Sequence, residues 1–218
     1  MFESAHVIGR GRVGSAIAAR LAERGVAARD DAELVLLCVP DDAIADVARE
    51  VEPGPWVAHV SGATSLRALA PHTQRFGLHP LQTFTRSRGP EQLDGAWAAV
   101  TSETAEARAL GHELARTLGL RAFDLDDEAR PAYHAGAAIA SNYLVTLHGA
   151  ASRLFELAGA PPEALVPLMS RTIENGFELT GPIARGDWNT VDAHVRAIHE
   201  EAPELEPMYV ALAEATRP

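Results

Sequence analysis

The sequence of 218 residues predicts an α/β protein, with a parallel sheet in the first half and only helices in the second. Up to residue 126, short apolar runs alternate with helical patterns, which is typical of strands joined by right-handed helical crossovers. Residues 34–39 are apolar without alternation and end at Pro40, as expected of a central strand buried on both faces. No convincing strand pattern follows Asp126. We therefore predict two domains, residues 1–126 and 127–218.

The elements are predicted from apolar periodicity and from the capping residues at their ends. Asp41 and Asp42 are predicted to cap a helix, and Pro131 suits a first helical turn. The predicted strands are residues 6–8, 34–39, 56–60, 75–78, 96–101 and 121–125, with a very short strand within 25–31. The predicted helices are residues 13–24, the one after Asp42, 103–118, 132–158, 161 to about 179, 190–199 and 204–215.

The charge and the basic residues exclude several classes of function. The formal net charge is −11 and no basic block occurs, which argues against a nucleic acid or an anionic membrane as partner. All 19 basic residues are arginines, so Schiff-base catalysis, a phosphate-loop lysine and a Tyr-x-x-x-Lys couple are excluded. We predict no metal ion as cofactor.

Cys38 is the one cysteine, so no intramolecular disulfide can form, which fits a reducing compartment. We find no charged leader and no apolar stretch near the ~20 residues that a membrane span needs. The expected location is the cytoplasm.

A Gly-x-Gly-x-x-Gly motif lies directly between the first predicted strand and the first predicted helix. Its first glycine permits a tight turn, its second lets the backbone approach a pyrophosphate, and its third allows the helix to pack closely on the strand. The motif predicts a Rossmann-type dinucleotide site, the alternative being a glycine-rich turn without a ligand. Its residues are Gly9, Arg10, Gly11, Arg12, Val13 and Gly14.

The residues after the motif give a weaker indication of which dinucleotide binds. The next strand begins by Leu34, so the helix that normally follows the second strand is missing and the adenine side is abbreviated. Arg29, with Arg10 and Arg12, could contact a 2′-phosphate, whereas Asp30 could contact a free 2′-hydroxyl. We favour NADP over NAD; the alternative is that these arginines face water.

Several further motifs resemble a family of bacterial proteins with a Rossmann-like first half and a carboxy-terminal domain of unassigned function. The family is related to the six-phosphogluconate-dehydrogenase-like and ketopantoate-reductase-like reductases. The resemblance spans essentially the whole chain and implies the same fold. It rests on the glycine motif, Val39-Pro40-Asp41-Asp42, His59-Val60-Ser61-Gly62-Ala63, His79-Pro80-Leu81-Gln82-Thr83-Phe84, Tyr133-His134, Ala140-Ser141-Asn142-Tyr143-Leu144, and residues 179–187.

The resemblance implies roles for individual residues. Val39 and Pro40 would lie at the nicotinamide ribose, Ser61 near the nicotinamide or substrate, and His79 would face the substrate. Related reductases carry Lys-x-x-x-Asn on the first long helix of the second domain. Placing Asn142 on that asparagine puts Ala138 where the lysine should be, so the usual proton donor is absent. Relatives often dimerise through this domain, which implies a homodimer.

A histidine is the natural replacement for the missing proton donor. His134 and Ser141 are seven residues apart, so on an uninterrupted α-helix they share a face with ~20° of drift. Asn142 lies beside that stripe and could orient a carbonyl group. We predict His134 and Asn142 as the substrate-side pair, with His79 facing them from the sheet; the alternatives are packing or strand-end roles for both histidines.

A second candidate lies in the loop at residues 180–187, where Gly181, Pro182 and Gly186 fix the backbone. Arg185 suits a substrate carboxylate through its bidentate fork, and Thr180 lies in the same loop. The alternative is an Arg185–Asp187 ion pair that shapes the loop.

The resulting hypothesis is an NADP-dependent oxidoreductase that reduces the carbonyl of a small carboxylate-bearing substrate. A 2-oxo acid such as ketopantoate is one version. The alternatives are a non-catalytic dinucleotide-binding sensor or scaffold, which the missing lysine favours, and a deazaflavin-linked reductase.

Overall fold

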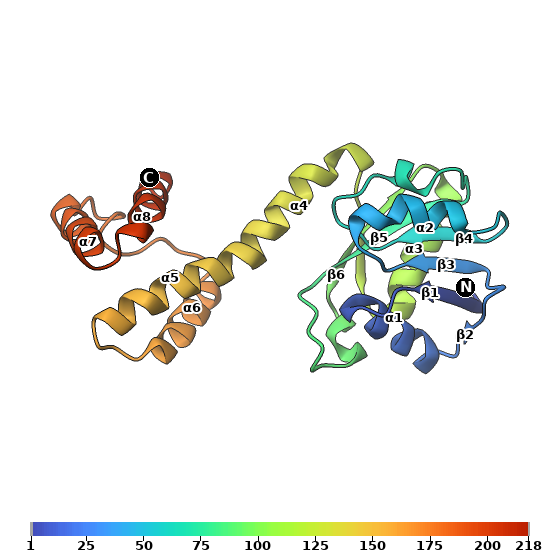
Figure 1. Ribbon diagram of the computed structural model, residues 1–218, viewed down its shortest axis with the longest axis horizontal. Coiled ribbons are helices and arrows are strands. Elements are labelled where there is room, and N and C mark those ends of the chain that lie inside the picture. Colours follow the sequence, from blue (N-terminus) through green and yellow to red (C-terminus); the bar gives the residue numbers. More distant parts are fainter. Residues whose placement is uncertain (1, 218) are drawn as a thin grey trace. The chain divides into compact units, whose positions relative to one another are not determined.

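The computed structural model describes residues 2–217 and divides into two compact units, one up to Ile139 and one from Ala140 onward (Figure 1). The first unit contains the whole sheet and also the helix α4, Arg130–Ala138. This unit therefore extends beyond residue 126, where the change of sequence pattern suggested a boundary. The physical reason is that α4 packs on the sheet through its first turns, as described below.

The first unit is built on one seven-stranded sheet in the order β2-β1-β3-β4-β5-β6-β7, which confirms the predicted α/β fold. All neighbouring strands are parallel except β5 and β6. The connection from β5 to β6 carries only a short 3₁₀ turn, Pro90–Leu93, and no crossover helix, so β6 returns antiparallel. The strands are β1 Ser4–Ile8, β2 Ala27–Ala28, β3 Leu34–Leu37, β4 Trp56–His59, β5 Arg75–Leu81, β6 Trp97–Ser102 and β7 Arg121–Asp124.

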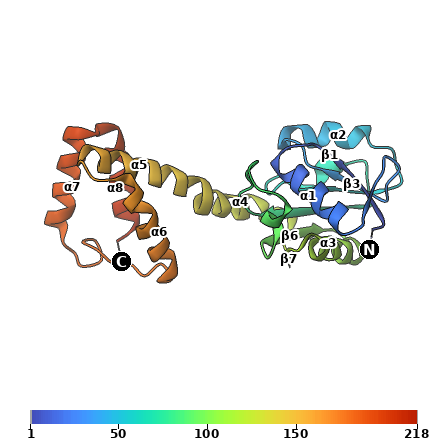
Figure 2. The same cartoon turned by 90° about the horizontal axis from the view of Figure 1, so that it is seen from below.

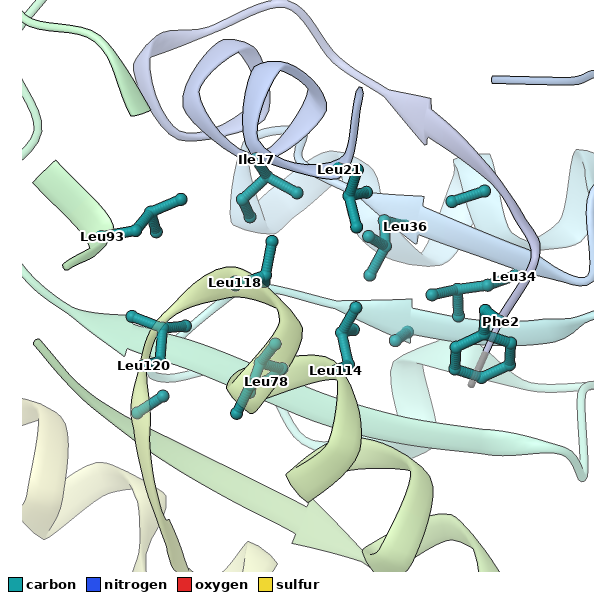
Figure 3. Packing of buried hydrophobic residues seen from close by; sticks show 14 of the residues in the cluster. Phe2, Ile17, Leu21, Leu34, Leu36, Leu78, Leu93, Leu114, Leu118 and Leu120 are labelled. Carbon is teal, nitrogen blue, oxygen red and sulfur yellow. The ribbon is translucent and has the colours of Figure 1, made fainter. Parts of the chain in front are cut away.

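Helices cover both faces of the sheet. The helices α1 (Arg12–Glu23) and α3 (Ala105–Leu118) share one apolar core with β1, β3, β5 and β6, and Figure 3 shows Ile17, Leu21 and Leu114 converging there. On the other face, α2 (Ile44–Glu50) packs over Val35, Leu37 and Val57. Figure 2 shows α2 and α3 on opposite sides of the strands. All four residues of β3 are buried, as the uninterrupted apolar run predicted.

Local chemistry explains where the helices begin and end. The Thr104 hydroxyl accepts a hydrogen bond from the Ala107 amide and caps α3, which ends at Gly119 in the left-handed conformation. The predicted cap at Asp41 and Asp42 is wrong. Both lie inside the 3₁₀ turn Asp41–Ala43 that precedes α2, and no side chain caps it.

The second unit is helical, and the described residues after β7 include no strand, as predicted. Its helices are α5 Leu144–Leu157, α6 Leu165–Glu174, α7 Trp188–Glu201 and α8 Glu206–Ala215. The helix predicted to run to about residue 179 ends at Glu174, because Gly176 and Phe177 both have positive φ. The helix predicted over residues 132–158 is interrupted by a π-helical segment, Ile139–Tyr143.

A search of the described helices for a membrane-spanning segment finds none of sufficient length and apolar character.

Candidate functional site

The glycine turn lies at the carboxyl end of β1, and each glycine meets a different steric demand. Gly9 has φ +107°, and a Cβ there would lie 2.3 Å from the Cys38 carbonyl oxygen. A Cβ on Gly14 would lie 2.1 Å from the Gly9 carbonyl oxygen, so α1 starts in direct contact with the turn. Gly11 has no heavy atom within 4 Å of its Cβ position. The turn therefore presents open backbone at a helix N-terminus, which suits a phosphate group.

The arginines predicted to bind the cofactor do not all lie together. Arg10 and Arg12 line a cavity of about 250 Å³ beside Gly11. Arg29 lines a different cavity, next to Phe2 and Ser4 at the start of β1. The cause is the register of β2, whose last residue Ala28 pairs with Ala5, about three residues or ~10 Å before the carboxyl end of β1. The predicted grouping of Arg29 with Arg10 and Arg12 is thus not found.

Asp30, the alternative ribose ligand, follows β2 and lies beside His6 of β1. Its carboxylate is 3.5 Å from the His6 Nδ1 atom. Both residues line a cavity where the helix missing after β2 would otherwise cover the sheet. That cavity carries several carboxylates, among them Asp31 and Glu50, so it does not favour a phosphate.

A cluster of three ring side chains forms where β5, which carries His79, meets α4, which carries Tyr133 and His134. The His79 Nδ1 atom is 2.7 Å from the Tyr133 hydroxyl, and the rings of His79 and His134 are 6.0 Å apart. Both histidines face Gly62: a Cβ there would lie 2.6 Å from His134 Cδ2 and 2.8 Å from His79 Cε1. Tyr133 and His134 share a face of α4 with Arg130, three and four residues earlier. The prediction that His79 and His134 lie together is met within the first unit.

Arg130 fixes this face of α4 to the sheet. Its side chain is fully buried, its Nη1 atom donates to the Ser61 carbonyl oxygen at 2.7 Å, and its Nε atom is 3.1 Å from the Asp127 carboxylate. Asp127 in turn accepts from the Ser65 hydroxyl and from the Leu66 amide. A Cβ on Gly77 would lie 2.2 Å from the Arg130 Nη2 atom, so that glycine makes room for the guanidinium.

Burial determines the protonation of the cluster. Burial lowers the pKa of His79 to about 4, and the neighbouring His134 and Arg130 act in the same direction. Burial also raises the pKa of Tyr133 to about 12. His59, which is fully buried beneath the cluster, has its pKa lowered to about 3, first by burial and then by Arg130. At neutral pH the His79 imidazole is therefore neutral and the Tyr133 hydroxyl protonated, so His79 suits a hydrogen-bond donor better than an acid.

The other sheet residues predicted for the site occupy the loops after β3 and β4. Val39 packs against the core under α2, and Pro40 precedes the turn that follows β3. The Ser61 hydroxyl accepts from the amides of Ala63 and Thr64 and donates to the Thr64 hydroxyl. It holds the turn that carries Gly62, and its role near the nicotinamide or substrate stays a prediction.

Ser141, Asn142, Thr180 and Arg185 belong to the second unit, and their roles stay predictions. Ser141 and Asn142 lie in the π-helical segment, where the Ser141 hydroxyl is 3.4 Å from the Asn142 side-chain oxygen. The α-helical spacing assumed between His134 and Ser141 does not hold across a π turn, which takes more residues per turn. Arg185 and Thr180 are exposed. Asp187 caps α7 through the Thr190 amide.

The sequence matches two family models. The model described as "Domain of unknown function (DUF2520)" covers residues 96–216, and one described as "Rossmann-like domain" covers residues 18–84. The chain belongs to the DUF2520 family. This confirms the resemblance seen in the motifs, and it places the His134 helix within the DUF2520 match. No curated protein matches the sequence.

Solved structures similar to this DUF2520 chain include three that align over nearly its whole length. A Bacteroides fragilis protein, assigned provisionally as an NADP oxidoreductase, has 21% identity, a TM-score of 0.80 and coverage of 97% of this chain and 96% of the other. A Thermotoga maritima protein has 25% identity, a TM-score of 0.77 and the same coverage. A Plasmodium falciparum pyrroline carboxylate reductase with NADP bound has 10% identity, a TM-score of 0.62 and coverage of 98% and 95%. These likenesses show the fold.

Sequence reasoning missed four residues of this DUF2520 site. Tyr133 and Gly62 occur in the motifs Tyr133-His134 and His59-Val60-Ser61-Gly62-Ala63, but the sequence predicts no role for either. Arg130 and Asp127 were not considered at all, although their i, i+3 spacing before a proline is a weak signal of a paired first turn.

Proposed function

We propose that the chain is an NADP-dependent oxidoreductase that reduces the carbonyl of a small carboxylate-bearing substrate, such as a 2-oxo acid. The observation that carries the proposal is the cluster of His79, Tyr133 and His134 around Gly62, at the sheet edge that also carries the open Gly11 turn. In an α/β sheet, ligands bind at this carboxyl edge. The solved structures with this fold include NADP-binding and NAD-dependent proteins, which supports a dinucleotide cofactor.

The separation of the two features fits one extended dinucleotide. Strands β3 and β4 lie between β1 and β5, so the Gly9 turn and His79 are three strand spacings or ~14 Å apart. The Gly11 backbone and the arginines beside it would hold the phosphates. Val39, Pro40 and Ser61, on the loops between, would lie along the nicotinamide half. When bound, the reduced nicotinamide supplies a hydride to the carbonyl carbon.

The chain's own residues then supply the proton and orient the carbonyl. The His79 Nδ1 atom and the Tyr133 hydroxyl are 2.7 Å apart, and in this proposal the hydroxyl is the donor, so that the hydrogen of the neutral imidazole is on Nε2. From there His79 donates a hydrogen bond to the carbonyl oxygen, and His134 donates the proton to that oxygen as the hydride arrives. For Asn142 and Arg185, which belong to the second unit, the proposal keeps the roles predicted from the sequence: orientation of the carbonyl and binding of the carboxylate.

Binding and turnover test this function separately. Titration with NADPH and NADH, followed by nicotinamide fluorescence, should give tight NADPH binding and weaker NADH binding. With a 2-oxo acid panel, His134→Asn should lower kcat by at least about 100-fold, as expected for loss of a general acid. NADPH affinity should stay within about twofold, since His134 binds no phosphate.

His112→Asn is the matched control, because His112 pairs with Asp124 outside the cluster. Failure to bind either nucleotide would overturn the proposal. Binding without turnover on any substrate would instead support a non-catalytic sensor or scaffold. Turnover only with reduced deazaflavin would support a deazaflavin-linked reductase.

We also propose that the chain forms a homodimer through its second unit. Large apolar side chains of α5 and α6 and of the segment after α6 are not covered by that unit's own helices. Val145 is 73% exposed and Phe177 72%, and Val166 and Leu168 are also exposed. Apolar patches of this kind mark protein interfaces. Light scattering should give twice the chain mass of 23.2 kDa, and Val145→Glu should give the monomer mass; a wild-type monomer would contradict the proposal.

A further inference from the structure

A concentration of positive charge lies beside the glycine turn, in a cavity that the sequence motifs did not reveal. The cavity of about 250 Å³ is bounded on one side by Arg10, Gly11 and Arg12 and on the other by the connection from β5 to β6. That connection contributes Arg86 and Arg88, and the cavity lining contains no carboxylate. Four arginines thus converge in one small cavity of a chain whose net charge is −11.

The loop that carries Arg86 and Arg88 is held in a fixed conformation. The side-chain amide of the buried Gln92 accepts from the Thr85 amide at 2.7 Å and donates to the Arg88 and Gly89 carbonyl oxygens at 3.0 Å. The Gly89 amide donates to the Glu91 carboxylate. One buried side chain therefore closes the loop at both ends. Such a loop loses little conformational entropy when it binds a ligand.

A second buried residue ties this loop to α1. Arg20 on α1 donates to the Pro90 carbonyl oxygen at 2.9 Å and pairs with the Asp94 carboxylate at 2.6 Å. Its Nη1 atom also donates to the Leu118 carbonyl oxygen. The last turn of α1 is thus fixed to the end of the Arg86 loop, and the cavity lies between that loop and the earlier turns of the same helix.

The protein neutralises the charges in the cavity only in part. Arg88 lies 3.5 Å from the Glu91 carboxylate and is ion-paired with it. Among residues 2–217, no carboxylate pairs with Arg10, Arg12 or Arg86. Unpaired arginines that face one another repel, and an anion relieves that repulsion.

We propose that Arg86, assisted by Arg88, binds a phosphate group of the dinucleotide from the side opposite the α1 N-terminus. This assignment rests on the proposed dinucleotide binding and replaces Arg29 as a source of charge for that phosphate. The phosphate is either the pyrophosphate, common to NADPH and NADH, or the 2′-phosphate, present in NADPH alone. The planar guanidinium of Arg86 forms two parallel hydrogen bonds to phosphate oxygens.

The test is fluorescence titration of the full chain and of Arg86→Gln, Arg86→Lys and Arg88→Gln with NADPH and NADH, and with ADP-ribose through its displacement of bound NADH. Arg86→Gln should weaken NADPH binding about tenfold, the effect of losing a charged hydrogen bond. Arg86→Lys should recover part of that loss, because it restores the charge but not the fork. Added salt should weaken binding by the wild type more than by Arg86→Gln, because the lost charge is screened.

The three ligands identify the phosphate. If Arg86→Gln loses affinity equally for all three ligands, Arg86 binds the pyrophosphate. If it loses affinity for NADPH alone, Arg86 binds the 2′-phosphate. Arg49→Gln, an exposed arginine on α2 paired with Asp46, removes the same charge elsewhere and should leave all affinities unchanged. Wild-type affinity in Arg86→Gln would overturn this inference while leaving the proposed function intact. Absence of binding in the wild type would overturn the proposed function itself.

Discussion

Arg130→Met is expected to lower the free energy of unfolding of the first unit by about 3 kcal/mol, the typical cost of removing one partner of a buried ion pair. The change leaves the Ser61 carbonyl oxygen without its 2.7 Å donor and the Asp127 carboxylate without its cation. Asp127 is only 23% exposed, so water compensates the carboxylate incompletely. Thermal denaturation followed by circular dichroism should show a midpoint lower by about 6–12 °C, from 2–4 °C per kcal/mol for a chain of this size.

Two further variants separate the ion pair from other effects of the substitution. Arg49→Met removes an exposed arginine of an i, i+3 pair and should cost no more than about 0.5 kcal/mol. Adding Asp127→Asn to Arg130→Met removes the unpaired charge, so the double variant should be more stable than the sum of the two single changes predicts. Equal midpoints for Arg130→Met and Arg49→Met would show that Arg130 does not anchor α4.

Gly62→Ala is expected to abolish most of the turnover with little change in cofactor affinity. The new methyl group would lie 2.6 Å from His134 Cδ2 and 2.8 Å from His79 Cε1, and the Tyr133 hydroxyl restrains His79. His134 must therefore move away. Displacement of a reacting group by about 1 Å costs on the order of 100-fold in rate, so kcat should fall at least that far.

Gly136→Ala is the matched control for this change. Gly136 lies on α4 two residues after His134, and no heavy atom is within 4 Å of its Cβ position. This variant should be as active as the wild type and slightly more stable, because alanine favours the helix by about 0.5–1 kcal/mol. The imidazole proton resonances of His79 and His134 give a readout that needs no substrate. They should shift in Gly62→Ala and not in Gly136→Ala; unchanged resonances in Gly62→Ala would contradict the geometry of the cluster.

The sheet and the glycine turn were predictable because each depends on local sequence. Residues 34–37 are buried on both faces, and such a strand is apolar at every position. Gly9 and Gly14 are required by contacts with the next strand and within the turn itself. His79 and His134 could be grouped because the resemblance supplied a topology in which a strand end and a helix start meet.

The remaining features depend on packing between segments distant in the sequence. Arg130 is an arginine in a polar stretch, and its burial follows only from the absence of a Cβ at Gly77, 53 positions earlier. Arg86 lies in a polar loop whose return onto α1 is fixed by the buried Arg20 and Gln92. The misplacement of Arg29 has a similar origin, since the register of a two-residue strand cannot be derived from its composition.

The π-helical segment could not be predicted from the sequence for a different reason. Residues 132–158 are nearly all compatible with a helix, and small residues around Ala140 give no apolar stripe strong enough to detect a change of period. The antiparallel direction of β6 does have a signal in the sequence. Residues 82–96 contain no helical pattern, and a parallel return requires a crossover of a dozen or more residues that is usually helical.

The position of Cys38 makes the sole thiol of the sequence a natural chemical probe of the glycine turn. Its carbonyl oxygen and Cβ lie against the Gly9 and Gly14 positions, and burial raises the pKa of the thiol to about 12. A thiol reagent reacts with thiolate, so the raised pKa of this partly buried thiol slows its labelling. The labelling rate therefore reports the surroundings of one defined place, without an engineered probe. A nucleotide that binds the turn and covers Cys38 would slow the labelling further, in proportion to its saturation.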